Sequence, residues 1–359
     1  MSTRHVTFGW LQAADDPRWS GLTRTWTSRT RTVPFGATSV VASWHADTPA
    51  GSWLEVAVQG RAGHADWSRW LVLARWADSD ATLRPTSVAG QQLDGVVVDA
   101  DEVRIDAAVA WTEVRARVVL NRAAESAPVP ALHRLGLLTS RVPAQAGPCV
   151  PARRTPLQID VPARSQQLHR DRYPRYGGGG QAWCSPTSVS MVLEHFGALP
   201  APADYQWVGD GPDRFVPHVA RRCFDEAYGG TGNWSFNVAY AAGQGLNAFV
   251  TRLRSLAEAE QLVAARIPLV LSVSFAADEL SGAGYSTAGH LLTVVGFTAD
   301  GDPVVNDPAS HELADNAQVR TTYDRCELER AWLSGSGGIT YVLHPPGLPL
   351  PPAAAEANW

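Results

Sequence analysis

The sequence predicts two structural parts, an all-β sandwich of jelly-roll type followed by an α+β domain. Three observations support this prediction. Short apolar segments with strand-like patterning fill residues 38–141, residues 142–156 show no periodicity, and helix-like and strand-like segments follow from residue 157 onward. A chain of 359 residues also exceeds the size at which one hydrophobic core usually stops growing, which favours two domains.

The predicted sandwich occupies residues 1–141. In SRWLVLARW and TEVRARVVL, apolar and polar residues alternate, as expected for strands with one buried and one solvated face. Glycine, proline, aspartate and serine separate the segments, as in the turns between strands. The six predicted strands are TSVVASW, SWLEVAVQG, SRWLVLARW, DGVVVDA, TEVRARVVL and LHRLGLLTS.

Nine of the 14 tryptophans fall within residues 1–111, among them Trp53, Trp67, Trp70 and Trp76. Exposed indole rings would offer stacking platforms for sugar rings, so this part is a candidate carbohydrate- or substrate-binding domain. Burial is the favoured interpretation, because each ring carries a large apolar area.

The α+β domain is predicted over residues 157–345, after a linker at 142–156. The segments SPTSVSMVLEHFG and SLAEAEQLVAARI have helical spacing, whereas PLVLSVSF and HLLTVVGF are predicted strands. The tail over 346–359 is rich in proline and alanine and is expected to be loose.

Charge and hydropathy exclude several functions. A net charge of -5 and a pI near 6.1 provide no cationic surface for nucleic acid. No segment approaches the ~20 apolar residues of a membrane span, so no membrane partner is expected. No signal peptide is visible, which favours the cytoplasm by default.

The four cysteines are Cys149, Cys184, Cys223 and Cys326, and none forms a CxxC pair. Because metal sites usually need close-spaced cysteine or histidine pairs, neither a metal nor another cofactor is expected. The adjacent pairs Glu194–His195 and His311–Glu312 are predicted to be surface residues. The three cysteines other than Cys184 are predicted to be reduced and mostly buried. One disulfide together with one free thiol is the alternative.

Cys184 is predicted to precede a helix. The segment after it places Val189, Val192, Leu193 and Phe196 on one face, with Pro186 in the first turn. A helix N-terminus favours a thiolate over a thiol, so this position activates a cysteine as a nucleophile.

A base and its partner are predicted further along the chain. His290 begins an apolar strand, and Asp307 ends the next strand after a turn signal at Asp300 and Gly301. A tight turn there would pair Asp307 with Val294, about 13 Å from His290 at ~3.4 Å per residue. Direct opposition therefore requires a longer loop or a bulge within TADGD.

The segments WCSPTSVSMVLEHFG, GHLLTVVGF and VVNDP, in this order, resemble the C39-like cysteine peptidases of the papain-like superfamily. The resemblance covers about residues 157–345. It implies a papain-like fold with Cys184 as nucleophile, His290 as base and Asp307 as the residue that orients the imidazole; Asn306 is the rival for the last role. It also implies a peptide or protein substrate, and resembling enzymes are often secreted.

Enzymes of this kind commonly use a glutamine upstream of the cysteine as an oxyanion donor. In this chain the spacing departs from the usual arrangement, because HRDRYPRYGGGGQAW stands between VPARSQQL and Cys184. Gln166 is the preferred residue, and Gln167 and Gln181 are its rivals.

The predicted function is a thiol hydrolase, a cysteine peptidase that cleaves peptide bonds through an acyl-enzyme. One alternative keeps the triad but passes the acyl group to an amine, as an amide-forming acyltransferase or another amidase. The other is a catalytically silent protein whose tryptophan-rich sandwich binds a glycan or wall polymer.

Overall fold

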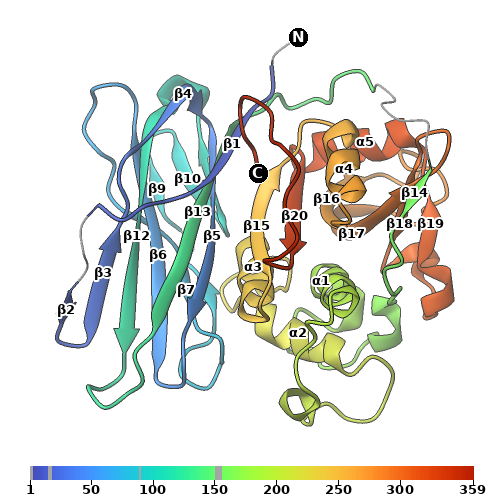
Figure 1. Ribbon diagram of the computed structural model, residues 1–359, viewed down its shortest axis with the longest axis horizontal. Helices are drawn as coiled ribbons and strands as arrows, with labels where there is room; N and C mark the ends of the chain where they lie inside the picture. Colours follow the sequence, from blue (N-terminus) through green and yellow to red (C-terminus); the bar gives the residue numbers. More distant parts are fainter. Residues whose placement is uncertain (1–2, 15–17, 89, 150–155) are drawn as a thin grey trace.

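In the computed structural model, residues 3–14, 18–88, 90–149 and 156–359 are described. The first part of the chain forms two antiparallel sheets packed face to face (Figure 1). In spatial order, the first sheet contains β1 (His5–Trp10), β13 (Ala131–Arg141), β5 (Ser39–Asp47), β11 (Glu102–Ile105), β10 (Val96–Asp99) and β9 (Gln92–Leu93). The second contains β2 (Trp19–Ser20), β3 (Thr23–Thr27), β12 (Trp111–Arg122), β6 (Ser52–Arg61), β7 (Leu71–Trp76) and β8 (Thr86–Ser87), with β4 (Arg31–Ala37) also paired to β12.

Alternation of apolar residues explains the sandwich. Along β12, the side chains of Val114, Ala116, Val118 and Leu120 are buried, and the residues between them are more exposed. All six predicted strands are present, as β5, β6, β7, β10, β12 and β13. The strands before residue 38 were not predicted, although Val6, Phe8 and Trp10 alternate along β1.

The third sheet carries the second part of the chain. In spatial order it contains β15 (Asn247–Arg252), β20 (Ile339–His344), β16 (Leu269–Phe275), β17 (Thr287–Phe297), β18 (Pro303–Asn306) and β19 (Arg320–Thr322), with β14 (Leu157–Gln158) also paired to β17. The helices are α1 (Cys184–His195), α2 (Phe215–Cys223), α3 (Trp234–Gly243), α4 (Leu256–Ala264) and α5 (Arg325–Gly335). Figure 1 shows α1 and α2 below this sheet and α4 and α5 above it.

The predicted fold class, an α+β domain preceded by an all-β sandwich, is confirmed. The limits of the domains stay predictions, and residues 150–155 of the expected linker lie outside the described residues. Among the described helices, none has the length and apolar character needed to cross a membrane.

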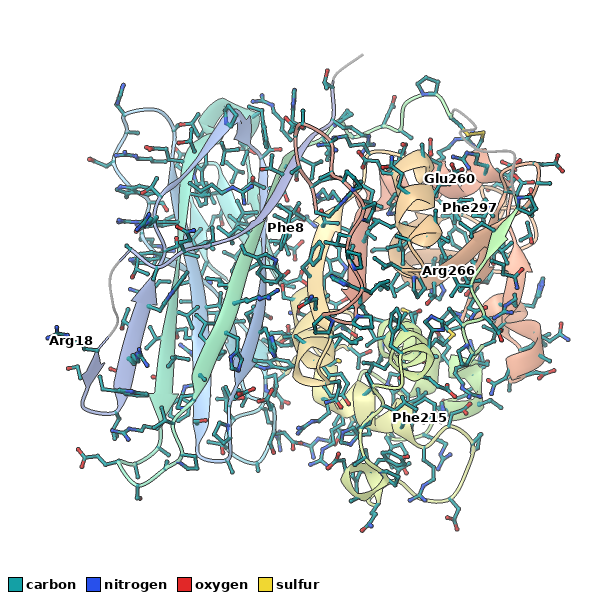
Figure 2. The ribbon with its side chains drawn as sticks, viewed as in Figure 1. Phe8, Arg18, Phe215, Glu260, Arg266 and Phe297 are labelled. Atoms are coloured by element: carbon teal, nitrogen blue, oxygen red, sulfur yellow. A yellow bond between two sulfur atoms is a disulfide. The ribbon has the colours of Figure 1, made fainter. Side chains whose placement is uncertain are left out.

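The sandwich and the α+β domain share an apolar junction, and their buried side chains form one continuous cluster. The rings of Phe8 and Phe249 stack with centroids 4.4 Å apart, and Figure 2 shows Phe8 at this junction. A buried ion pair accompanies them, with Arg252 Nη2 2.6 Å from Glu102 Oε1. Because a buried charge is costly without its partner, this pair helps to fix how the two parts meet.

The C-terminal segment is packed, so the expectation of a loose tail is wrong. Figure 1 shows it beside β1 and β15. The Phe8 N–H donates to the Ala357 carbonyl at 3.0 Å. Asn358 is fully buried, and its amide donates to the Arg252 carbonyl at 2.9 Å. Backbone and amide hydrogen bonds that composition does not reveal hold this segment in place.

The tryptophans of the sandwich are mostly engaged with the protein itself. Trp44, Trp76 and Trp111 are at most 3% exposed. The guanidinium group of Arg115 lies 4.4 Å from the ring centre of Trp67 and 5.5 Å from that of Trp70. This agrees with the packing interpretation, and carbohydrate binding stays a prediction.

Candidate active site

Cys184 is the first residue of α1 and is partly exposed. The chain reaches it through a 3₁₀ turn, Gly180–Ala182. A Cβ atom at Gly180 would lie 2.3 Å from the carbonyl carbon of His169, so this close approach of two backbones requires glycine. The helix N-terminus and this tight turn together present the thiol at the surface of the domain.

The surroundings of Cys184 favour its thiolate. Burial by itself would raise the pKa of this thiol, but the hydrogen bond with His290 and the charge of that imidazole lower it, as do the backbone N–H groups of Leu291 and Ser185. The net result is a pKa below the ordinary value for cysteine. A lowered pKa and partial exposure are the two features of a reactive cysteine.

His290 lies in β17 and is 3% exposed. Its Nε2 atom lies 2.8 Å from Oδ1 of Asp307, which is fully buried. Burial alone would lower the pKa of His290, but the Asp307 carboxylate and the contact with Cys184 raise it to about 10. Because Nε2 donates to Asp307, Nδ1 is the ring nitrogen left for the Cys184 sulfur.

The register between β17 and β18 explains how His290 and Asp307 meet. Phe297 pairs with Pro303 around a loop over residues 298–302, and a bulge between Val294 and Gly296 shifts the pairing once more. The predicted irregularity is therefore present, partly in the loop and partly within β17. Thr293 pairs with Asn306, so Asp307 would face Leu292 and is a diagonal neighbour of His290, within reach of a side chain.

Two tyrosines hold the other oxygen of the Asp307 carboxylate. The hydroxyl groups of Tyr285 and Tyr323 each donate to Oδ2 at 2.7 Å, and the Ala309 N–H donates to Oδ1 at 2.9 Å. Burial would raise the pKa of Asp307, but His290 and these hydroxyl groups lower it below its ordinary value. Neither tyrosine was predicted as a site residue, because its spacing from His290 and Asp307 in the sequence does not indicate a contact with the carboxylate.

Asn306, the rival of Asp307, is committed elsewhere. Its Nδ2 donates to the carbonyl oxygens of Val161 and Pro162 at 3.1 and 3.3 Å, and its Oδ1 accepts from Arg320 Nε at 3.0 Å. These contacts tie β18 to the segment before α1. Of the two neighbouring residues, Asp307 is the one that contacts His290.

The three candidate glutamines differ in how their side chains are used. Gln166 is 2% exposed, and its Nε2 donates one hydrogen bond, to the Gln181 carbonyl at 2.7 Å. Both donors of the Gln181 amide are taken, by Asp171 Oδ1 at 3.1 Å and the Gly178 carbonyl at 3.0 Å. Gln167 is 5% exposed, and among the described residues the Oε1 atoms of Gln166 and Gln167 both have no hydrogen-bond partner. Gln166 therefore keeps a second amide hydrogen for a ligand.

Of the residues predicted to lie on the surface, Glu194 and His195 are partly exposed and contact other segments of the chain. Glu194 accepts a hydrogen bond from Arg164 Nε at 2.8 Å, and His195 is close to the Asp160 carbonyl at 3.1 Å. His311 and Glu312 are exposed. Neither pair forms part of a group of metal-ligating side chains among the described residues.

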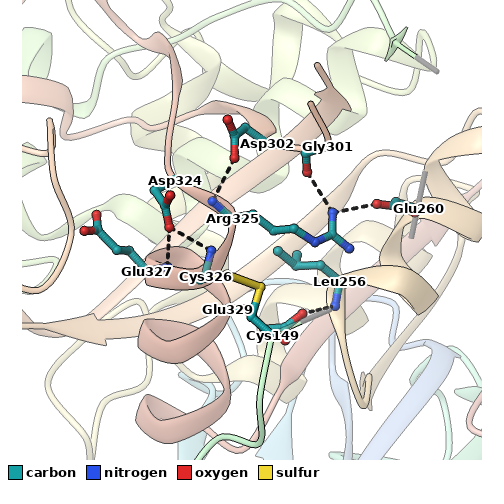
Figure 3. The surroundings of a disulfide bond; sticks show 10 residues. All are labelled: Cys149, Leu256, Glu260, Gly301, Asp302, Asp324, Arg325, Cys326, Glu327 and Glu329. Atoms are coloured by element: carbon teal, nitrogen blue, oxygen red, sulfur yellow. Dashed lines mark hydrogen bonds and ion pairs between the residues drawn. A yellow bond between two sulfur atoms is a disulfide. The ribbon is translucent and has the colours of Figure 1, made fainter. Parts of the chain in front are cut away.

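The favoured prediction for the cysteines other than Cys184, that all three are reduced thiols, is wrong, and the alternative of one disulfide and a free thiol is found. Cys223 is a buried free thiol as expected, but Cys149 and Cys326 form a disulfide with a Cα–Cα distance of 5.4 Å (Figure 3). Cys326 lies in the first turn of α5, where the Asp324 side chain caps the helix by accepting from the N–H groups of Cys326 and Glu327, each at 2.9 Å. The capped helix holds one cysteine against the linker that carries the other. Because disulfides persist in oxidising surroundings, the cysteines no longer favour a reducing compartment.

Cys184 and His290 line a cleft of about 1470 Å³ between the two parts of the chain. Gln166 and Tyr285 also line it, and one wall comes from the sandwich hairpin formed by β10 and β11. Two exposed apolar side chains line this cleft, one from each part of the chain: Val97 of the sandwich, at 41% exposure, and Tyr228 of the α+β domain, at 58%. The sandwich was expected only as a candidate substrate-binding domain, and none of its residues was predicted to line the site.

Two protein-family models match the chain, one on each of its two parts. The model of the Peptidase C39 N-terminal domain matches residues 12–140, and that of the Peptidase_C39 like family matches residues 158–338. No curated protein matches the chain. A solved structure from Bacillus anthracis, described provisionally as a C39-like peptidase, matches with 16% identity and a TM-score of 0.33, over 53% of this chain and 97% of its own. On the family match, which covers half of its length, the chain belongs to the C39-like peptidase family.

Proposed function

We propose that this chain is a cysteine peptidase that cleaves peptide bonds in the cleft between its two parts. The observation that carries the proposal is the continuous series of contacts from Cys184 through His290 to the buried Asp307 carboxylate, at the wall of that cleft. A thiol with a base and a residue that orients the base is the arrangement that nucleophilic catalysis requires.

The pKa directions support a resting pair of thiolate and imidazolium. The pKa of Cys184 is lowered and that of His290 is raised, so the proton belongs on the imidazole. The thiolate attacks the carbonyl carbon of the scissile bond, a C–S bond forms, and the carbonyl oxygen takes the negative charge. The Gln166 amide is the proposed donor to that oxygen.

Collapse of this intermediate breaks the C–N bond, and the His290 imidazolium gives its proton to the departing amine. Water then attacks the acyl-enzyme, with His290 taking its proton, and the thiolate leaves. Asp307 stays ionised throughout and stabilises the imidazolium. Transfer of the acyl group to an amine in place of water would use the same residues, and analysis of the products distinguishes the two outcomes.

Alkylation at low pH tests the site directly. The protein is treated with iodoacetamide at pH 5–6, and the modified cysteine is identified by peptide mass. At that pH a thiol with a pKa of ~8.5 is protonated and slow, whereas a thiolate paired with an imidazolium reacts. Fast labelling of Cys184 that is lost in His290→Ala supports the proposal, and labelling no faster than that of Cys223 contradicts it.

Digestion of a peptide library by the native chain tests the reaction. Cys184→Ala is the matched control, because it removes only the sulfur. Cleavage by the native chain alone is the expected result. The acyltransferase would be favoured over the peptidase by a different result. In that case Cys184 is alkylated rapidly, but the protein hydrolyses no peptide and forms amides when an amine is added.

A further inference from the structure

A cluster of three metal-ligating side chains lies on the sandwich, away from the cleft. His45, Asp47 and His133 each offer one ligand atom, and these atoms all lie within 4.8 Å of one another. The strand β5, which carries two of them, starts at Ser39 on the wall of the cleft. At ~3.4 Å per residue, His45 is about 20 Å further along that strand.

The strand geometry explains why the three side chains meet. His45 and Asp47 are two residues apart in β5 and therefore point to the same face of the sheet. The neighbouring residues Trp44 and Ala46 point into the sandwich, where they are 0% and 5% exposed. The outer face thus carries the imidazole and the carboxylate.

The third side chain reaches the same face through a β-bulge. In the pairing of β13 with β5, Leu132 lies opposite Ala46 and Arg134 lies opposite His45, so His133 is an extra residue between them. A bulge redirects a side chain that regular alternation would send elsewhere. Here it brings His133 Nε2 to 2.8 Å from Asp47 Oδ2, with the rings of His45 and His133 4.8 Å apart.

We propose that His45, Asp47 and His133 form a binding site for a divalent transition metal ion, with zinc as the best match. Two imidazoles and one carboxylate are a common three-ligand set for zinc, with the fourth position left to water. Bond lengths of 2.0–2.1 Å require ligand atoms about 3.3 Å apart in a tetrahedral site. The widest separation in the cluster, at most 4.8 Å, would therefore contract by up to about 1.5 Å, and the 2.8 Å contact between His133 Nε2 and Asp47 Oδ2 would open by about 0.5 Å. The side chains of Asp47 and His133 are 63% and 42% exposed and are free to make this adjustment.

The charges around the cluster favour binding. The Asp47 carboxylate supplies the negative charge of the cluster for the cation. The nearby Arg134 is directed away, since its Nη1 donates to Asn247 Oδ1 at 3.2 Å and its guanidinium lies 5.5 Å from the Trp10 ring centre.

Zinc at this position would connect β5 to β13 beside the junction with the α+β domain. Ser43, on the same face of β5, accepts a hydrogen bond from the Val250 N–H at 2.9 Å. Arg134 reaches Asn247 of the same strand, β15. Because the metal would bind the folded chain and not the unfolded one, it would stabilise the strands that carry this junction.

Isothermal titration with zinc chloride tests the site in the full chain without a histidine tag. The Cys184→Ser variant is the parent protein, because the active-site thiolate is a competing zinc ligand. One zinc ion per chain is expected. His45→Gln, Asp47→Asn and His133→Gln should each weaken the Kd by at least about tenfold, since even outer-shell changes cost 10–100-fold. His64→Gln, an exposed histidine outside the cluster, should bind as the parent does.

A second measurement needs no substitution in the cluster. Diethylpyrocarbonate modifies accessible histidines, and peptide mass reports each position in the parent protein with and without zinc. Protection of His45 and His133, but not of His64, supports the site. Absence of zinc binding, an unchanged Kd in the cluster variants, or equal modification of His45 and His133 with and without zinc would overturn it.

Discussion

The Nε2 atom of His290 lies 2.8 Å from Oδ1 of Asp307, although the strand register carries Asp307 toward Leu292. The two residues are diagonal neighbours, and the side chains close the gap that the backbone pairing leaves. The second oxygen of the carboxylate is fixed by Tyr285 and Tyr323. The position of Asp307 thus depends on four hydrogen bonds in addition to the turn between the strands.

Asp307→Asn should separate charge from geometry at this site. The amide can still accept from His290, but the negative charge that raises the pKa of His290 is lost. We expect labelling of Cys184 at pH 6 to fall at least about tenfold and to recover near the ordinary thiol pKa of ~8.5. In the native protein, labelling should begin at the lowered pKa of Cys184. Identical pH profiles for the two proteins would contradict this role of Asp307.

Gln166→Ala should lower kcat for peptide hydrolysis by about 10²–10³, the usual loss when one oxyanion donor is removed. Alkylation of Cys184 forms no oxyanion, so its rate at pH 6 should stay the same. Gln167→Ala and Gln181→Ala serve as matched controls. A larger loss of kcat in either control would transfer the oxyanion role to that residue.

The disulfide predicts how many cysteines react with a thiol reagent before and after reduction. Unfolded without reductant, the chain should react with two equivalents of a thiol reagent, from Cys184 and Cys223, and with four after reduction. Cys149→Ser/Cys326→Ser should lower the free energy of unfolding by about 2–4 kcal/mol. Four reactive thiols in the unreduced protein would mean that the pair is not joined.

Asp101 makes stability depend on pH. It comes from the sandwich, and its Oδ2 accepts from the Trp234 and Ser235 N–H groups at the start of α3. Burial raises the pKa of Asp101 to about 7, so the folded state holds a proton that the unfolded state releases near pH 4. This stabilisation is complete below pH 4 and is lost as the pH rises to 7.

Asp101→Asn keeps an acceptor for the helix but cannot titrate. The free energies of unfolding of the native protein and the variant are measured by denaturation between pH 4.5 and 8. The value for the native protein minus the value for the variant should decrease as the pH rises, by on the order of 1–4 kcal/mol. A difference that is flat across this range would show that Asp101 titrates normally.

The sandwich wall of the cleft should affect substrate binding more than the chemical step. Val97→Ala and Tyr228→Ala remove apolar surface that faces the cleft. We expect both to raise KM for peptides, while iodoacetamide, which is too small to reach across the cleft, should still label Cys184 at the native rate. Unchanged KM in both variants would place the substrate away from this wall.

Much of the local structure could be predicted from the sequence. Apolar segments between turn residues, several of them with period-two alternation, predicted six strands of the sandwich. The spacing after Cys184 predicted α1, because burial of one face imposes such a pattern on neighbouring residues. Cys184 and Asp307 could be named because they lie at the start of α1 and directly after β18, and His290 because the apolar run within β17 follows it. The structure brings the same three residues together.

Tertiary structure alone decided what depends on contacts between distant residues. Four features join segments far apart in the chain: the pairing of Cys149 with Cys326, the burial of the C-terminal segment, the sandwich wall of the cleft and the cluster around His133. The tyrosines that hold Asp307 are nearer in the chain, but only the fold brings their hydroxyl groups to the carboxylate. Local patterns record only which face of an element is buried. Which segments then lie side by side is set by the packing of whole sheets, and a bulge or a turn of one extra residue changes it.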